Sequence, residues 1–321
     1  MVNEGSVVYD LFGHRIELRC ASEAIIESLT HKESCWKPLL TSPSSRDADV
    51  VVDVIQHRPP SPMTAVQHFS NANFFFHGSR SRLITGYLSA RPWQVHVQSY
   101  VEDDVATLDN MILPALNTIL LRLGLANVHC AAVARSGHGM LLIGPSQSGK
   151  STTSLLLARA GMDFVSDNDV YLRRSARGVR AMSSNPELFL LDDAIERFPE
   201  LELARDAPIR HRGRTAKRVL DMARAMPDRC ASEAEVHVVV FPRVGDAAAT
   251  TVKPVDAATC LGWLLEQVPA RGLPAMIKDE IAIRGLFDLL ARVSTTATIY
   301  QATLGSDPSG VVAELDSLLS G

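Results

Sequence analysis

The fold is decided by the stretch Leu141-Leu142-Ile143-Gly144-Pro145-Ser146-Gln147-Ser148-Gly149-Lys150-Ser151-Thr152. It contains Gly-x-x-x-x-Gly-Lys-Ser, the phosphate-binding loop motif, in the context that the motif requires. Apolar residues 140–143 predict a buried strand before the loop, and residues 150–160 predict a helix after it. In such a loop the backbone N–H groups form an anion-binding nest, to which the helix N-terminus adds further donors. We therefore predict that the chain binds a nucleoside triphosphate.

Each part of this loop has an expected role. Gly144 and Gly149 permit backbone conformations and a close approach that a Cβ atom would obstruct. Lys150 is expected to reach the β- and γ-phosphates, and the hydroxyl of Ser151 to ligate Mg²⁺. The candidate nucleotide-binding residues are Gly144, Pro145, Ser146, Gln147, Ser148, Gly149, Lys150, Ser151 and Thr152. The alternative is a glycine-rich turn that binds nothing, which the flanking strand and helix disfavour.

Composition indicates a soluble globular protein. The chain has 321 residues, of which 46% are hydrophobic and 21% charged, and this length allows two domains. The net charge of −4 provides no basic field for nucleic acid or anionic membranes, so neither is expected as a partner. The five cysteines are scattered singly, which argues against a disulfide framework or a zinc site. The first residues lack the pattern of a signal peptide, and we expect a cytoplasmic protein.

The first third of the sequence has a β pattern. Strands are expected within 7–20, where Ile16, Leu18 and Cys20 share one face, and at further positions along the chain. These further strands are expected at 50–55, 74–76, 82–88 and 93–98. The β content and the Pro/Ser-rich stretch 58–62 contrast with the remainder. We therefore predict a smaller, mostly-β domain over 1–107, serving acceptor recognition or assembly, and a nucleotide-binding domain over 108–321.

The second domain is expected to bring two carboxylates to the phosphates. A helix from 108 to 123 precedes a strand at 127–134, and 140–143 return antiparallel to it, into the loop. A buried strand at 163–166 follows the loop and helix, and its end carries Asp167 and Asp169. Ligands in α/β folds bind beyond the carboxyl ends of the strands. One carboxylate would hold Mg²⁺ and the other would accept a proton from an attacking hydroxyl; the alternative is an Asx-rich turn.

Residues 127–172 resemble the core of bacterial HPr kinase/phosphorylase and its relatives. The resemblance is carried by His129, the hairpin, the phosphate loop and the strand end Val165-Ser166-Asp167-Asn168-Asp169-Val170. In that family a P-loop domain of PEP-carboxykinase-like topology phosphorylates a serine on a protein or peptide. The resemblance implies the same α/β topology here, ATP and Mg²⁺ as cofactors, an acceptor that carries a serine, and assembly into homo-oligomers.

The family's site residues carry over with two departures. Asp167 matches the first residue of an Asp-Asp pair, the candidate general base and metal neighbour, but Asn168 stands at the second position and Asp169 follows. Which carboxylate is the base is therefore open. His129 matches a histidine near the phosphates, and the alternative is a structural histidine of the hairpin. The Pro-Gly-Arg-Asn segment of the bifunctional enzymes is absent, so a phosphorylase activity is not expected. The divergent lineage of this family also includes kinases that act on lasso-peptide precursors.

Further charged residues follow this core. The stretch 205–218 is rich in arginine and lysine, and it is either a lid over the phosphates or a solvated loop. Lys217 and Arg218 are the chosen nucleotide contacts, because the apolar residues 219 and 220 would fix them. Glu187 is a candidate metal ligand, beside Ser151 and Asp167.

These observations favour an ATP-dependent, Mg²⁺-requiring kinase that acts on a serine hydroxyl of a protein or peptide. Its expected catalytic residues are Lys150, Asp167, Asp169 and His129. Two alternatives stay open, namely a small-molecule kinase of the same fold and a nucleotide-sensing binding module without transferase activity. A transporter-type ATPase is disfavoured, because the sequence has no Leu-Ser-Gly-Gly-Gln signature.

Overall fold

The computed structural model describes residues 5–30, 47–56, 67–79, 82–99, 112–212, 215–267 and 279–320. The chain forms two compact units, Met1–Gly124 with Gly272–Leu286, and Leu125–Arg271 with Phe287–Gly321. The expected boundary at 107/108 lies outside the described residues, and the units divide after Gly124 instead. Among the described residues, no helix has the length and apolar character that crossing a membrane would require.

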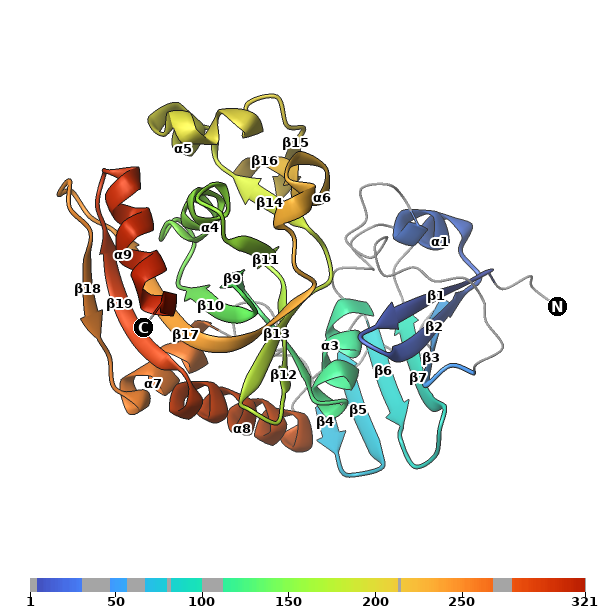
Figure 1. Cartoon of the computed structure of the whole chain (residues 1–321). Coiled ribbons are helices and arrows are strands. Elements are labelled where there is room, and N and C mark those ends of the chain that lie inside the picture. The colour runs from blue at the N-terminus through green and yellow to red at the C-terminus, as the bar shows by residue number, and fades with distance from the viewer. Residues whose placement is uncertain are drawn as a thin grey trace. The chain divides into compact units, whose positions relative to one another are not determined.

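The first unit contains a seven-stranded sheet in the order β1-β2-β3-β7-β6-β5-β4 (Figure 1). Its strands are β1 (Gly5–Leu11), β2 (His14–Cys20), β3 (Val50–Gln56), β4 (Gln67–Ser70), β5 (Phe74–Ser79), β6 (Arg82–Tyr87) and β7 (Trp93–Ser99). The predicted strands are confirmed, and Ile16, Leu18 and Cys20 are buried, as their alternation predicts. The helices are α1 (Glu23–Thr30) and α3 (Leu113–Arg122), while residues 108–111 of the expected helix and the stretch 58–62 lie outside the described residues.

A buried ion pair ties together three segments of the first unit. The guanidinium of Arg122, at the end of α3, lies 2.7 and 2.8 Å from Oδ2 of Asp279, and the two side chains are 4% and 1% exposed. Arg122 also donates to the carbonyl oxygens of Asn71 and Ala72. The other oxygen of Asp279 accepts the backbone N–H of Ala282 at the start of α8 (Glu280–Thr296). This pair explains why α3 belongs to the first unit.

Asp279→Ala is expected to destabilise the first unit by about 3–5 kcal/mol, because it leaves a buried guanidinium without its carboxylate. The measurement is urea unfolding of the full chain. Arg19→Ala is the matched control, since it breaks the half-exposed pair of Arg19 and Glu17, 2.9 Å apart, and should change stability by about 1 kcal/mol or less. Equal losses in the two variants would contradict a structural role for the buried pair.

The second unit is built on a nine-stranded mixed sheet. Its main order is β11-β9-β10-β17-β13-β12-β8, and β19 joins β17 and β18. The strands are β8 (Leu125–Val128), β9 (Cys130–Arg135), β10 (His138–Ile143), β11 (Asp163–Asp167), β12 (Val170–Arg174), β13 (Val179–Ser183), β17 (Glu233–Val244), β18 (Thr251–Pro254) and β19 (Thr298–Leu304). The mixed α/β class expected from the sequence is confirmed, whereas its PEP-carboxykinase-like topology stays a prediction.

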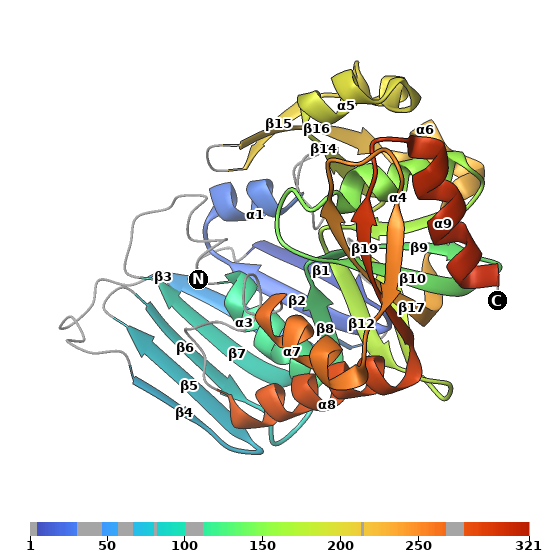
Figure 2. The ribbon, with the colours of Figure 1, turned by 90° about the vertical axis from the view of Figure 1, so that its left-hand side faces the viewer.

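Helices cover this sheet on its two faces. The glycine-rich loop 144–149 leads into α4 (Lys150–Arg159), which contacts both β9 and α9 (Pro308–Ser320). Val311 and Leu315 of α9 share a buried cluster with Val240 of β17. The side chain of Phe241 alternates with that of Val240 and meets the ring of Trp263 on α7 (Ala257–Gln267), with 4.8 Å between ring centroids. Figure 2 shows the same ribbon turned by 90° about the vertical axis of Figure 1.

A small three-stranded sheet, in the order β14-β16-β15, completes the second unit. Its strands are β14 (Glu187–Leu190), β15 (Ile209–Arg212) and β16 (Thr215–Asp221), accompanied by α5 (Asp192–Arg197), α6 (Met222–Ala225) and the 3-10 turns Pro199–Ala204 and Pro227–Arg229. Leu188 and Leu220 of this sheet pack with Leu155 of α4 in one buried cluster. Helix α4 therefore lies between the large sheet and the small one (Figure 1).

Candidate functional site

The glycine-rich loop joins β10 to α4 through two residues with left-handed backbone. Gly149 has a φ of 95° and forms the N-cap of α4, and Gln147 has a φ of 67°. The positive φ of Gly149 favours glycine, and a Cβ atom there would lie 2.7 Å from Cδ1 of Leu304 on β19, so that side chain would have to shift. α4 begins at Lys150, and the N-terminal end of a helix is a favourable place for an anion because its first N–H groups receive no carbonyl oxygen from the helix itself.

Strand register brings the end of β11 beside the start of this loop. β9 pairs antiparallel with both β10 and β11, so those two strands run in the same direction. Ala131 of β9 is opposite Leu142 on one side and Asp167 on the other. The last residue of β11 is therefore level with the last residues of β10. Because β10 and β11 run in the same direction and end at the same level, the loop after β10 and the carboxylate at the end of β11 lie close together.

The hydroxyl of Ser151 meets the carboxylate of Asp167. Its Oγ atom lies 2.8 and 3.0 Å from the two carboxylate oxygens. The Oδ2 atom of Asp167 also accepts the side-chain amide of Asn168 at 3.2 Å and the backbone N–H of Phe189 at 3.1 Å. The sequence prediction that Asp167 approaches the phosphate loop is thus met by direct contacts.

Burial and hydrogen bonding have opposite effects on Asp167. The side chain is only 3% exposed, and this burial raises the pKa of its carboxyl above the usual value. The bonds from Phe189 and Ser151 and the charges of Lys217 and Lys150 act in the opposite direction without cancelling the rise. A carboxylate in this position holds its charge at an energetic cost, which an approaching cation would relieve.

The polar groups inside the loop fit an anionic ligand. The ammonium of Lys150 donates to the carbonyl oxygens of Gly144 at 2.7 Å and Pro145 at 2.8 Å, and the side chain is 5% exposed. The hydroxyl of Ser148 is buried and has no hydrogen-bond partner among the described residues. Buried hydroxyls are normally bonded, so this one fits a loop that is completed by its ligand.

A pocket opens over the loop and is lined by polar and apolar residues. The loop and α4 contribute Ser146, Gln147, Gly149, Lys150, Ser151 and Thr152, and the strand ends contribute His129 and Asn168. The rest of the lining comes from β14, β16 and the region of α5, and consists of Phe189, Leu190, Leu191, Ala194 and Lys217. Of the residues predicted to bind nucleotide, Gly144, Pro145, Ser148 and Arg218 do not line this pocket.

Of the other expected catalytic residues, His129 lines this pocket and Asp169 does not. His129 lines it, and its Nδ1 atom lies 3.0 Å from the carbonyl oxygen of Asn168. A carbonyl oxygen only accepts, so this contact places the proton on Nδ1. Asp169 does not line the pocket, and its Oδ1 atom accepts the amide of Asn127 at 3.3 Å. Asp167 therefore contacts the loop through the hydrogen bonds that its carboxylate accepts from Ser151.

The charged residues of the small sheet lie partly inside and partly outside the pocket lining. Lys217 of β16 lines the pocket, whereas Arg218 points to Asp192, with Nε and Oδ1 2.6 Å apart. Glu187, the third expected metal ligand, lies outside the pocket lining, and its two oxygens accept both terminal nitrogens of Arg210 at 2.9 and 3.1 Å. Arg214 and the side chain of Arg212 lie outside the described residues.

Two contributors to the site were not assigned from the sequence. Phe189 binds Asp167 through its backbone N–H, and a backbone group leaves no signature in the sequence. Asn168 binds Asp167 through its side chain and has a φ of 70°. Asparagine is one of the few residues that adopts this left-handed conformation readily, and that preference was the available signal.

The residues fit a magnesium ion that is shared with a phosphate ligand. Mg²⁺ in such sites takes a P-loop hydroxyl and a nearby carboxylate, and keeps several waters. Ser151 and Asp167 are these two groups, already in contact. In the described ranges no cluster of three or more His, Cys, Asp and Glu side chains could hold a metal by itself.

Comparisons with known proteins add little. No protein-family model matches the sequence, and no curated protein matches it. Among solved structures, the chain is similar to the HPr(Ser) kinase/phosphatase from Coxiella burnetii, with 14% identity and a TM-score of 0.27. That similarity covers 40% of this chain and 72% of the other. Because the TM-score and the identity are so low, the functional proposal depends on the loop and its contacts.

Proposed function

We propose that the protein is a phosphotransferase that uses ATP and Mg²⁺ to phosphorylate a serine hydroxyl on a protein or peptide. The observation that carries the proposal is the contact of Ser151 with the buried Asp167 beside the glycine-rich loop. The choice of serine and of a protein or peptide acceptor comes from the sequence resemblance. A small-molecule kinase of the same fold would use the same residues and differs only in its acceptor.

The residues of this site would act through position and charge. The N–H groups of the loop and of the first turn of α4 hold the β- and γ-phosphates. Bound Mg²⁺ neutralises charge on the phosphates, and Ser151 and Asp167 are the residues that would hold it. Lys150 turns from the loop carbonyls to the phosphates, and Asp167 is the acid placed to orient the attacking hydroxyl or receive its proton. Lys217 adds a cation from the pocket wall.

Lys217→Ala is expected to lower kcat about tenfold, equivalent to about 1.4 kcal/mol of transition-state stabilisation, because it removes a charge from the pocket wall. Arg218→Ala is the matched control on the same strand, since Arg218 is bound to Asp192, and its kcat should stay near that of the wild type. The measurement is steady-state transfer from ATP at saturating nucleotide. A larger loss in Arg218→Ala than in Lys217→Ala would exclude this orientation of β16.

The function is tested by incubating the full chain with γ-labelled ATP, Mg²⁺ and acceptor candidates encoded by neighbouring genes. Label on serine of a protein or short peptide, located by mass spectrometry, is the expected result. Label on a small molecule would move the assignment to the alternative kinase. Tight nucleotide binding without turnover across all acceptors would identify a nucleotide-sensing module and refute the transferase proposal.

A further inference from the structure

The strands that carry the phosphate loop have a second polar cluster at their opposite end. β10 begins at His138 and reaches the loop after Ile143, and β17 begins at Glu233. In their parallel pairing, His138 is opposite Glu235. Five residue steps at about 3.3 Å each separate the cluster from the loop by about 16 Å. The cluster is therefore distinct from the nucleotide pocket, and the proposed function makes no use of it.

Two histidine rings of this cluster lie close together, with their planes tilted relative to each other. The ring centroids of His138 and His237 are 4.2 Å apart, and the ring planes differ by 32°. His237 stands at an irregularity of this pairing, since Gly139 is opposite Val236 whereas Met140 is opposite Val238. His138 is exposed and His237 is half-buried. The pair is thus reachable from solvent while one of its members is held in the sheet.

A hydrogen bond orients the ring of His237. Its Nδ1 atom lies 2.9 Å from the backbone oxygen of Glu235, an acceptor, so Nδ1 carries the proton and Nε2 has the lone pair. Metal-binding histidines are oriented in this way, with the non-ligating nitrogen donating to a backbone oxygen or carboxylate.

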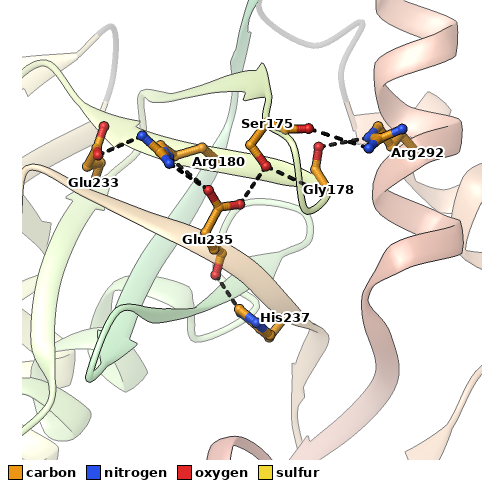
Figure 3. A network of polar contacts seen from close by, with 7 residues as sticks. All are labelled: Ser175, Gly178, Arg180, Glu233, Glu235, His237 and Arg292. Atoms are coloured by element: carbon orange, nitrogen blue, oxygen red, sulfur yellow. Dashed lines mark hydrogen bonds and ion pairs between the residues drawn. The ribbon is translucent and has the colours of Figure 1, made fainter.

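Hydrogen bonds from neighbouring side chains hold the carboxylate of Glu235 in place (Figure 3). The carboxylate of Glu235 accepts Nε and Nη2 of Arg180 at 3.0 and 2.8 Å and the hydroxyl of Ser175 at 2.7 Å. Arg180 also binds Glu233 at 2.8 Å, and Arg292 donates to the oxygen of Gly178 at 2.8 Å. The carboxylate of Glu235 is occupied by these partners, so the histidine pair is left as the metal-binding element.

We propose that His138 and His237 bind a transition-metal cation of the Cu²⁺ or Ni²⁺ class through their imidazole nitrogens, with water as the remaining ligands. Cations of this class prefer nitrogen and oxygen ligands in a tetragonal arrangement. Two nitrogens bound at right angles, each about 2.1 Å from the metal, lie about 3 Å apart. His138 is exposed, so its ring is free to rotate until one of its nitrogens reaches that distance from Nε2 of His237.

The test uses the full chain and Cu²⁺ as the probe, with excess Mg²⁺ present to occupy sites built from oxygen ligands. Electron paramagnetic resonance is expected to show one equivalent of bound Cu²⁺ with two nitrogen ligands. His138→Ala should remove one nitrogen and weaken the affinity by about tenfold or more. His68→Ala is the control, since His68 is exposed on β4 in the first unit, and its spectrum and affinity should match the wild type.

A copper spectrum and affinity unchanged by His138→Ala would overturn the proposal, as would a wild type that binds Cu²⁺ no more tightly than the double variant without both histidines. Thermal unfolding without metal checks that each variant is folded. His237 is half-buried, and if its alanine variant unfolds, His138→Ala decides the question alone, because that side chain is exposed.

Discussion

Replacing Lys150 by methionine is expected to lower kcat for phosphoryl transfer by about 10²–10³-fold or more. Lys150 is 5% exposed and is held by the carbonyl oxygens of Gly144 and Pro145. Its ammonium is therefore a charge held at the edge of the loop, and it exchanges these carbonyl oxygens for phosphate oxygens when a nucleotide binds. Methionine keeps the length of the side chain and removes the charge.

The measurement is transfer of label from ATP, together with nucleotide affinity from a fluorescent analogue. Lys253→Met is the control, because Lys253 is an exposed lysine of the same unit on β18, and it should leave both quantities unchanged. Urea unfolding shows whether Lys150→Met is folded. A folded Lys150→Met variant with the kcat of the wild type would refute the role of the loop in catalysis.

Asp167→Asn is expected to have opposite effects on activity and stability. The activity should fall by about 10²–10⁴-fold, since asparagine can neither receive a proton nor give Mg²⁺ a negative ligand. The free energy of unfolding at neutral pH should rise by about 1 kcal/mol, because the variant no longer buries a charge. Asparagine can keep the contacts, with its oxygen accepting from Phe189 and Asn168 and its amide donating to Ser151.

The sign of the stability effect follows from the raised pKa of Asp167. A carboxyl with a higher pKa in the folded state favours folding below its unfolded pKa, near about 3.9, and this contribution is lost as the pH rises through the folded pKa. The advantage of Asp167→Asn should therefore be largest at neutral and alkaline pH and shrink as the pH falls. Thermal unfolding from neutral to acidic pH measures it, and an advantage that grows toward acid would contradict the assignment.

Asp169→Asn separates the two carboxylates. Asp169 bonds to Asn127 and does not line the pocket, so its variant should keep most of the activity. If Asp169→Asn instead causes the larger loss, Asp169 is the base and Asp167 acts on the metal. Partial recovery of Asp167→Asn at high Mg²⁺ would identify its role as metal binding, because extra Mg²⁺ compensates for a weaker site but supplies no base.

The parts of the site that follow from sequence are those fixed by strand register and turn chemistry. The spacing of Gly144, Gly149 and Ser151 predicts a strand, a left-handed turn and a helix, and the structure has all three. Asp167 follows a buried strand that runs in the same direction as the strand before the loop. Its place beside the loop is therefore a consequence of local pattern.

The parts that could not be predicted depend on contacts across the fold. Glu187 and Arg218 have the right charges, but each is held by a partner from another segment, Arg210 and Asp192 respectively. The backbone N–H of Phe189 serves Asp167 whatever side chain the residue carries. Pairings between segments distant in sequence have no periodic signature, which is why the small sheet could be expected only as a basic stretch.

The ion pair of Arg122 and Asp279 also constrains how the chain is made. The two residues are 157 positions apart, and the stretch between them supplies most of the second unit. During synthesis Arg122 leaves the ribosome long before Asp279 does. The guanidinium in the first unit therefore has no carboxylate partner while the second unit is being synthesised. The first unit should therefore reach its full stability only when translation has passed residue 279. In a nascent chain stalled before that point, the first unit should remain sensitive to protease.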